Sequence, residues 1–373
     1  MNFLLSIIPS VLVLGILIVI HELGHFLACR MTNVKVEKFS IGFGPEIFHW
    51  ESNGTRYALS LFPLGGFVKP AGESVSEVGA DGPRPGDYLA APLFARIFIV
   101  AAGVLMNYLL AYVLFAAIFM TGRPVPGTTI GTLIDDYPAK AAGLHPGDTI
   151  TALNGQAVDS WTELMTALEN APDSGFQVTV ERPAEDANSQ PAIKSMEMVP
   201  KVETLQDVFG KDHRVKRIGI TPHPSSRKVE HYGFAAALKE ALKMEISLTV
   251  LTHKAIFYLL TGRLSLKTVS GPIGIISMTG DAVGLGWPYI LQLTATLSVS
   301  LAVINLLPIP ALDGGHLLFL LIEAIARRRV SLQVQERATQ AGFVLLLIFM
   351  GFVIYNDLTN MNVFGRIGTM LGR

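Results

Sequence analysis

The segment His21-Glu-Leu-Gly-His25 contains the side chains whose types and spacing best fit a chemical reaction. In a helix, residues four positions apart share one face, so His21 and His25 could both offer a ring nitrogen to one metal ion. Two histidines in this spacing, with a glutamate after the first, are typical of zinc sites in which the glutamate is the general base. We therefore predict zinc ligation by His21 and His25 and general-base catalysis by Glu22.

This five-residue pattern also arises by chance, so its surroundings decide how much it means. It follows directly on residues 3–20, a stretch without any charged side chain. Ionisable side chains at membrane depth are costly unless they are paired or ligated, and a bound zinc ion would remove that cost. The alternative is that the helix ends at Ile20 and that the histidines are solvated residues at the membrane surface.

A zinc site of this kind needs a third protein ligand and leaves the fourth position for water. Asp313 is an acidic residue that directly follows the uncharged stretch 287–312. Two prolines before it and two glycines after it predict a broken helix, which is tolerated at membrane depth where it lines a wet cavity. We predict Asp313 as the third ligand. His316 is the alternative, and we expect it to support the site rather than to bind the metal.

Four uncharged stretches are long enough, or nearly so, to cross a bilayer, since a spanning helix needs about 20 apolar residues. They cover residues 3–20, 97–120, 287–312 and 338–356. Only 16% of the 373 residues are charged and 50% are hydrophobic, whereas a soluble domain has about 25% charged residues. We expect a multi-pass membrane protein. A net charge of −1 gives no reason to expect binding to nucleic acid.

Basic residues near these stretches predict the orientation of the chain, because cytoplasmic loops carry an excess of lysine and arginine. Arg30, Lys35, Lys38 and further basic residues follow the first span, and Arg327–Arg329 lie between the third and the fourth. Both loops are therefore expected in the cytoplasm, with the histidine motif near that side. Both termini and the long segment after the second span are expected outside.

A polar segment, residues 122–286, separates the second span from the third. Its run Ala-Gly-Leu-His-Pro-Gly-Asp-Thr-Ile-Thr-Ala-Leu-Asn-Gly, at residues 142–155, resembles the PDZ domains of bacterial proteases, and the resemblance covers about 125–203. It implies that a peptide or a chain end is bound as an added strand, or that the domain acts only as a size filter. Residues 233–261 are expected to form an amphipathic helix on the outer membrane surface.

Residues 56–69 have the composition of a β-hairpin. Tyr57, Leu59 and Leu61 alternate with Ala and Ser, and a Pro-Leu-Gly-Gly run indicates a turn. A substrate helix unwound in lipid needs hydrogen-bond partners for its backbone, and an edge strand could supply them by strand addition. The alternative is an ordinary cytoplasmic hairpin that covers the helix ends.

Taken together, the histidine motif, the Asn-x-x-Pro-x-Pro-x-Leu-Asp-Gly motif at residues 305–314 and the intervening PDZ-like segment resemble the site-2 proteases, closest to the bacterial regulator of sigma-E protease type. The resemblance covers essentially the whole chain. It implies that His21, His25 and Asp313 bind zinc and that Glu22 activates water. It also implies a membrane re-entrant hairpin with a Gly-Phe-x-Lys element. The predicted substrate-binding residues are Asn305, Tyr57, Leu59, Leu61, Gly66 and Phe67.

The predicted fold is a polytopic α-helical membrane protein with four transmembrane helices, a membrane-associated β-hairpin and an extracytoplasmic PDZ domain of the α+β class. Many close relatives carry two PDZ domains, whereas this chain has room for one. The expected parts are a first span with the zinc motif (1–27), a cytoplasmic loop with the hairpin (28–94), a second span (95–121), the PDZ domain (122–205), a post-PDZ region with the amphipathic helix (206–286), a third span with the Leu-Asp-Gly motif (287–316), a cytoplasmic loop (317–337), a fourth span (338–356) and a tail (357–373).

These features predict an intramembrane zinc endopeptidase of the bacterial inner membrane that acts in regulated intramembrane proteolysis. Its expected substrates are transmembrane segments of single-span proteins, either anti-sigma-factor-type regulators or remnant signal peptides. The expected partners are these substrates, a peptide or chain end at the PDZ domain, and the lipid bilayer. The alternative is a non-enzymatic PDZ-bearing adaptor or a metal transporter. A transporter would need ionisable residues on several spans, and the second and fourth stretches have none.

Overall fold

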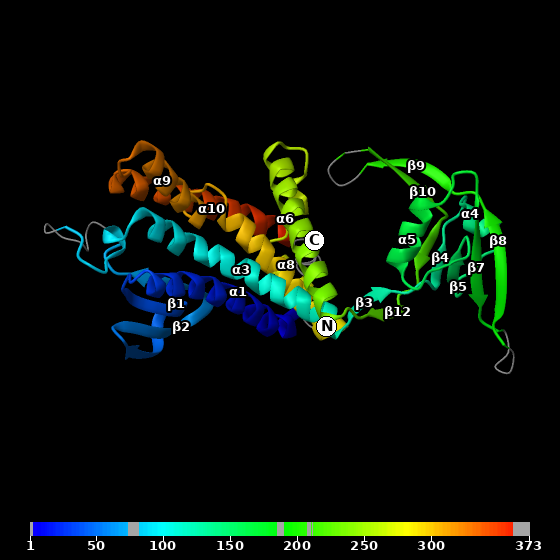
Figure 1. Cartoon of the computed structure of the whole chain (residues 1–373), viewed down its shortest axis with the longest axis horizontal. Coiled ribbons are helices and arrows are strands. Elements are labelled where there is room, and N and C mark those ends of the chain that lie inside the picture. Colours follow the sequence, from blue (N-terminus) through cyan, green and yellow to red (C-terminus); the bar gives the residue numbers. More distant parts are fainter. Residues whose placement is uncertain (1–2, 74–81, 185–189, 207–209, 211, 361–373) are drawn as a thin grey trace, which may run out of the picture. The chain divides into compact units, whose positions relative to one another are not determined.

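The computed structural model describes residues 3–73, 82–184, 190–206, 210 and 212–360, and it divides into two compact units (Figure 1). Unit 1 comprises Met1–Ile118 and Ala235–Arg373, and unit 2 comprises Phe119–Phe234. Unit 1 contains the long apolar helices, and unit 2 contains most of the strands.

Within the described parts of the chain, four helices are long and apolar enough to cross a membrane, as predicted. They are α1 (Phe3–Met31), α3 (Leu93–Thr121), α8 (Trp287–Asn305) and α10 (Leu332–Asn360). In Figure 1, the axes of α1, α3 and α8 are roughly aligned, and α6 crosses them steeply. The other helices are α6 (Phe234–Leu260), α7 (Pro272–Leu285) and α9 (Asp313–Ala326), with short 3-10 helices at Tyr88–Ala90 and Leu266–Thr268.

The contact between α1 and α3 places the zinc motif against a second span. Ala28 and Cys29 of α1 are buried in one cluster with Ala102 of α3. A Cβ atom at Gly24 would lie 2.3 Å from the carbonyl oxygen of Ala102, so only glycine permits this approach. Small residues of this kind let two helix backbones pack closely in a membrane. The helix that carries both histidines therefore lies directly on α3.

The β-sheet of unit 1 consists of β1 (Val36–Ser52) and β2 (Thr55–Pro70). They are joined by a tight turn at Asn53-Gly54, where both residues have positive φ. The turn therefore lies ten residues before the Pro-Leu-Gly-Gly run at which the sequence suggested one.

Both halves of the predicted hairpin pair with β1. Residues 38–41 of β1 pair with residues 56–59 and also with residues 66–69. The prediction of a self-paired hairpin within 56–69 is therefore wrong, because its two halves lie on opposite sides of β1. The outer edge of the second half faces α1, where the amide of Val68 meets Glu22.

The third span ends earlier than predicted, and a helix replaces much of the predicted loop that follows. Helix α8 ends at Asn305, a turn segment contains Pro308 and Pro310, and α9 begins at Asp313. Proline cannot donate a helical hydrogen bond, which accounts for the break. A Cβ atom at Gly315 would lie 2.3 Å from the carbonyl oxygen of Ile309, so the glycines allow α9 to pack against the turn.

Helix α10 extends beyond both predicted ends of the fourth span, and hydrogen bonds near each end connect it to other parts of unit 1. Thr339 donates to the carbonyl oxygen of Pro310 at 3.1 Å. At the other end, the carboxylate of Asp357 accepts the main-chain amides of Gly271 (3.0 Å) and Gly274 (3.0 Å) at the start of α7. The middle of α10 presents many exposed apolar side chains, as expected for a surface that faces lipid. Residues 361–373 of the predicted tail lie outside the described residues.

Unit 2 is a small α+β unit. Its strands are β3 (Arg123–Pro126), β4 (Ile130–Leu133), β5 (Thr149–Leu153), β6 (Gln156–Ala157), β7 (Phe176–Arg182), β8 (Ala192–Met198), β9 (Lys201–Gln206), β10 (Asp212–Arg217), β11 (Ile220–Pro222) and β12 (Arg227–Glu230). Its helices are α4 (Pro138–Ala141) and α5 (Trp161–Asn170). Four strands form a sheet in the order β6-β5-β7-β8, and β3, β4 and β9 pair with β12, β11 and β10.

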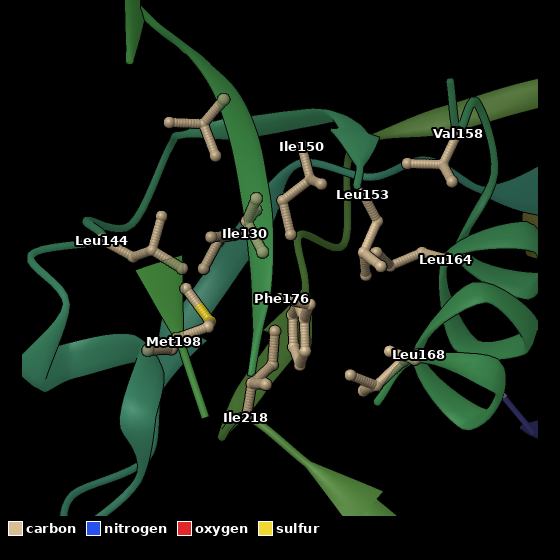
Figure 2. Close-up of a cluster of buried hydrophobic side chains, with 14 residues drawn as sticks. Ile130, Leu144, Ile150, Leu153, Val158, Leu164, Leu168, Phe176, Met198 and Ile218 are labelled. Carbon is tan, nitrogen blue, oxygen red and sulfur yellow. The ribbon is translucent and has the colours of Figure 1, made fainter. Parts of the chain in front are cut away.

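One apolar core holds unit 2 together. Ile150, Leu164 and Phe176 are among the buried side chains that point toward one another between the strands and α5 (Figure 2). Each fully buried aliphatic side chain contributes about 1.5–3 kcal/mol relative to exposure. Ile218 also belongs to this core, and β11 pairs with β4. The predicted domain end at residue 205 is therefore too early, because strands up to Glu230 complete the unit.

An ion pair in unit 2 links Asp148, the residue before β5, to Arg182 at the end of β7. Asp148 is 1% exposed, and its carboxylate accepts two hydrogen bonds of 2.7 Å from Arg182 and one of 2.8 Å from the amide of His145. Burial alone would raise the pKa of Asp148, but these donors lower it below its ordinary value of 3.8. Because the pKa is lower in the folded state, the ionised carboxylate stabilises the fold at pH values above 3.8. This contribution is lost as the pH falls through the pKa of the folded state.

We therefore expect Asp148→Asn to destabilise unit 2 by about 1.5–3 kcal/mol at pH 7, because asparagine lacks the charge that strengthens the hydrogen bonds from the partly exposed Arg182. Hydrogen exchange of the β5 and β7 amides in the full-length protein measures this loss. The difference between the variant and the wild type should shrink as the pH falls below 3.8, where the carboxylate of the unfolded chain takes up a proton, and it should be lost as the pH falls through the lower pKa of the folded state. An equal difference at pH 3 and pH 7 would contradict this explanation.

Candidate active site

The structure brings together the three side chains that the sequence singled out as metal ligands. The Nε2 atoms of His21 and His25 lie 3.2 Å apart, and Oδ2 of Asp313 lies 3.1 Å from the first and 3.5 Å from the second. Both histidines are on α1, four positions apart, and Asp313 is the first residue of α9. His21 is 7% exposed and the other two are partly buried.

These distances fit a zinc ion. Ligand atoms about 2.0–2.1 Å from a tetrahedral zinc ion lie about 3.3 Å from one another. In addition, Oδ2 of Asp313 is buried and accepts no hydrogen bond from the described residues, although two histidine nitrogens are nearby. Lone pairs that converge without a donor between them are the donor set a cation requires. The site residues therefore fit the metal that the motif suggests.

Helix α3 lies directly behind the two histidines. A Cβ atom at Gly103 would lie 2.3 Å from Nε2 of His25 and 2.9 Å from Cε1 of His21. Only a glycine leaves room for both rings at this position. Nδ1 of His25 lies 2.8 Å from the carbonyl oxygen of Ile99, one turn earlier on α3. No sequence pattern indicated the role of Gly103, because the need for a glycine arises only from the helix contact.

Glu22 lies on the same turn of α1 as the ligands. Its Oε2 accepts a hydrogen bond of 3.0 Å from the main-chain amide of Val68 on β2. Gly66 is close as well, because a Cβ atom there would lie 3.5 Å from Cγ of Glu22. The outer edge of β2 thus runs past the proposed catalytic base.

A cavity of about 490 Å³ opens beside the ligands. It is lined by the three ligands and Glu22 and, further away, by Arg96 and Glu323, among other residues. Arg96 is almost completely buried and donates to Glu323 at 3.0 Å. This mixture of polar and charged walls admits water, which hydrolysis requires.

The other predicted site residues are only partly gathered here. Asn305 lies at the end of α8, with Nδ2 3.4 Å from Nε2 of His21. Gly66 lies beside Glu22, and Phe67 and His316 line the cavity.

The remaining predicted substrate-binding residues lie elsewhere on the sheet. Tyr57, Leu59 and Leu61 belong to the half of β2 that pairs on the other side of β1. Tyr57 stacks on Trp50 at 5.1 Å between ring centroids and contacts Phe26. Leu59 and Leu61 are exposed, whereas Ala58 and Ser60 between them are buried, so the alternation places the larger apolar side chains on the outer face of the sheet.

The sequence comparisons identify the family of this chain. A family model described as "Peptidase family M50" matches residues 9–349. Proteins that each carry the name "putative zinc metalloprotease" are similar over almost their full length. One from Agrobacterium fabrum is 33% identical and covers 95% of this chain and 96% of its own. One from Campylobacter jejuni is 34% identical, and the match covers 95% of this chain and 93% of the relative. One from Clostridium acetobutylicum is 32% identical, and the match covers 94% of this chain and 97% of the relative. The chain therefore belongs to peptidase family M50, the site-2 protease family, and is a multi-pass, membrane-embedded zinc metalloprotease.

Proposed function

We propose that this protein is an intramembrane endopeptidase that hydrolyses peptide bonds within the transmembrane segments of single-span membrane proteins. The observation that carries the proposal is the convergence of His21, His25 and Asp313 on helices of a unit that has four candidate membrane spans among its described residues. A peptidase site built on such helices lies at the depth of the segments it would cut. The proposed location is the bacterial inner membrane, with the zinc motif near the cytoplasmic side.

We assign zinc binding to His21, His25 and Asp313. When bound there, zinc supplies the Lewis acidity that activates a water molecule and polarises the scissile carbonyl. Glu22 acts as general base and then as general acid, since it takes the proton of the attacking water and delivers it to the leaving amine. Asn305, beside the ligands, is assigned to contact the substrate backbone.

The edge of β2 is assigned to hold the unwound substrate. A transmembrane helix hides its peptide bonds in its own hydrogen bonds, so it must unwind before it is cut. Exposed backbone groups then need partners. Val68 directs its amide toward α1 and away from β1. Because alternate residues of a strand direct their backbone groups to opposite edges, Gly66 shares this outward edge. A substrate strand that pairs here would pass beside Glu22.

Unit 2 is proposed to be a PDZ domain on the extracytoplasmic side that screens substrates. The support is the Gly-rich run at residues 142–155 and the α+β arrangement of strands around α5. Screening by capture of a newly exposed chain end and exclusion of large ectodomains are both consistent with this role. Anti-sigma-factor-type regulators and remnant signal peptides are the proposed substrate classes.

Strand addition at Val68 is tested by two substitutions that both remove the valine side chain, of which only one also removes the backbone N–H group. Val68→Pro removes the N–H group and is sterically tolerated on an edge strand, whereas Val68→Ala keeps it. We expect Val68→Pro to lower cleavage of a single-span substrate in membranes by about 10- to 100-fold, the cost of one unmade buried hydrogen bond. Val68→Ala should stay within about threefold of wild type.

Both variants should bind as much zinc as the wild type, because neither touches a ligand. Equal cleavage by Val68→Pro and Val68→Ala would contradict the assignment of this edge. If the wild type cleaved soluble peptides but no membrane-embedded segment, the intramembrane activity itself would be wrong.

A further inference from the structure

The two histidines of the site are held by different kinds of partner at their second ring nitrogens. Nδ1 of His25 lies 2.8 Å from the main-chain carbonyl oxygen of Ile99. A carbonyl oxygen only accepts hydrogen bonds, so this Nδ1 carries the proton and Nε2 keeps its lone pair. His25 is therefore fixed in the tautomer that binds a metal through Nε2, whether or not the metal is present.

The partner of His21 is a side chain. Its Nδ1 lies 3.2 Å from the side-chain amide of Asn107, which is on α3 and is completely buried. A side-chain amide can donate or accept a hydrogen bond, so the end that faces Nδ1 decides whether the Nε2 lone pair is available to a metal.

The side chain of Asn107 also has an atom without a partner. Its Oδ1 is buried and makes no hydrogen bond with the described residues. The helix contact itself is made by the main chain, because Ser298 of α8 donates to the carbonyl oxygen of Asn107 at 2.7 Å. The side-chain amide is therefore not needed to join α3 to α8, and its two ends occupy nearly the same volume. When Oδ1 faces His21, the buried oxygen gains a hydrogen-bond donor in Nδ1–H.

We propose that Asn107 is a positioning residue that sets the tautomer of His21 and thereby the zinc affinity of the site. Oδ1 of Asn107 accepts a hydrogen bond from Nδ1–H of His21, so that the Nε2 lone pair faces the metal position. Partners of this kind orient metal-binding histidines and raise their basicity. The inference rests on His21 as a ligand but goes beyond the proposed proteolysis.

Zinc affinity of the purified full-length protein, measured by competition with a chelator, provides the first test. Asn107→Leu has a similar volume but no hydrogen-bonding group, and we expect its zinc affinity to fall by about 10- to 100-fold. Asn107→Asp keeps an acceptor for Nδ1–H and should remain within about threefold of wild type. The matched control is Ser298→Ala, which alters the neighbouring helix contact and should leave the affinity unchanged. Wild-type affinity in Asn107→Leu would overturn the proposal.

The tautomer itself can be measured, and this test needs no variant to fold. Nitrogen NMR of ring-labelled histidine, assigned to His21 by comparison with His21→Gln, reports which ring nitrogen carries the proton. We expect a protonated Nδ1 and an unprotonated Nε2 for His21 in the wild type before and after zinc is added, as for His25. A protonated Nε2 of His21 in the zinc-free protein would overturn the proposal. Failure of the wild type to bind zinc would refute the metal site as well.

Discussion

Replacement of Glu22 by glutamine is expected to abolish cleavage of membrane substrates while the protein keeps its zinc. Glutamine preserves the shape of the side chain and the hydrogen bond from the Val68 amide, but it cannot take a proton from water. General-base catalysis contributes about 10²–10⁴-fold to a reaction rate, so the loss should be of that order or larger. The measurement is cleavage of a single-span reporter in membranes, with zinc content determined on the same preparation.

A second glutamate of the same cavity supplies the control for this substitution. Glu73 also lines the cavity but is not adjacent to the ligand atoms. The cleavage rate of Glu73→Gln should therefore stay within about threefold of the wild-type rate. If Glu22→Gln retained substantial cleavage, the assignment of the base would be wrong even though the metal site could stand.

Replacement of Asp313 by alanine is expected to remove zinc and activity together. The two remaining histidines leave the ion with two protein ligands, whereas catalytic zinc sites have three. Because loss of a residue that merely orients a ligand costs about 10- to 100-fold in affinity, loss of the ligand itself should cost more than about 100-fold. Metal analysis after dialysis against a weak chelator, together with the cleavage assay, measures both effects.

His316 provides the matched control for Asp313. It is one turn along α9 and lines the same cavity, but it is not part of the group whose ligand atoms converge. His316→Ala should keep zinc within about threefold of the wild-type affinity. Loss of zinc in His316→Ala but not in Asp313→Ala would show that the third ligand had been assigned to the wrong residue.

These experiments also separate the protease from a protein that uses the same fold differently. An adaptor that acts through unit 2 would keep its function in Glu22→Gln and Asp313→Ala. A transporter would need an ionisable path through several spans. In the described structure, the charged residues Arg96 and Glu323 near the site are paired with each other, and Arg329 also contacts Glu323.

The sequence predicted those parts of the molecule that depend on local pattern. The four spans followed from uninterrupted apolar length. The proximity of His21 and His25 followed from helical spacing alone, and the helix over residues 233–261 corresponds closely to α6. Asp313 was inferred because an acid beside a broken span needs a partner at membrane depth.

The parts that sequence did not predict depend on contacts between distant segments. Nothing in residues 56–69 indicates that β1 separates their two halves, because strand partners are chosen over long range. The sequence prediction ended the PDZ domain too early because β11 pairs with β4, a strand some 90 residues earlier in the chain. The contact between Asn107 and His21 became visible only once α1 and α3 were placed side by side.

The hydrogen bond between Val68 and Glu22 has a consequence for when the enzyme can work. One amide proton cannot fully satisfy two acceptors, so a peptide that aligns along this edge must compete with the carboxylate for it. Arrival of the chain to be cut would thereby free the carboxylate for proton transfer. In such an enzyme the general base stays hydrogen-bonded to its own strand until the substrate itself takes over the amide.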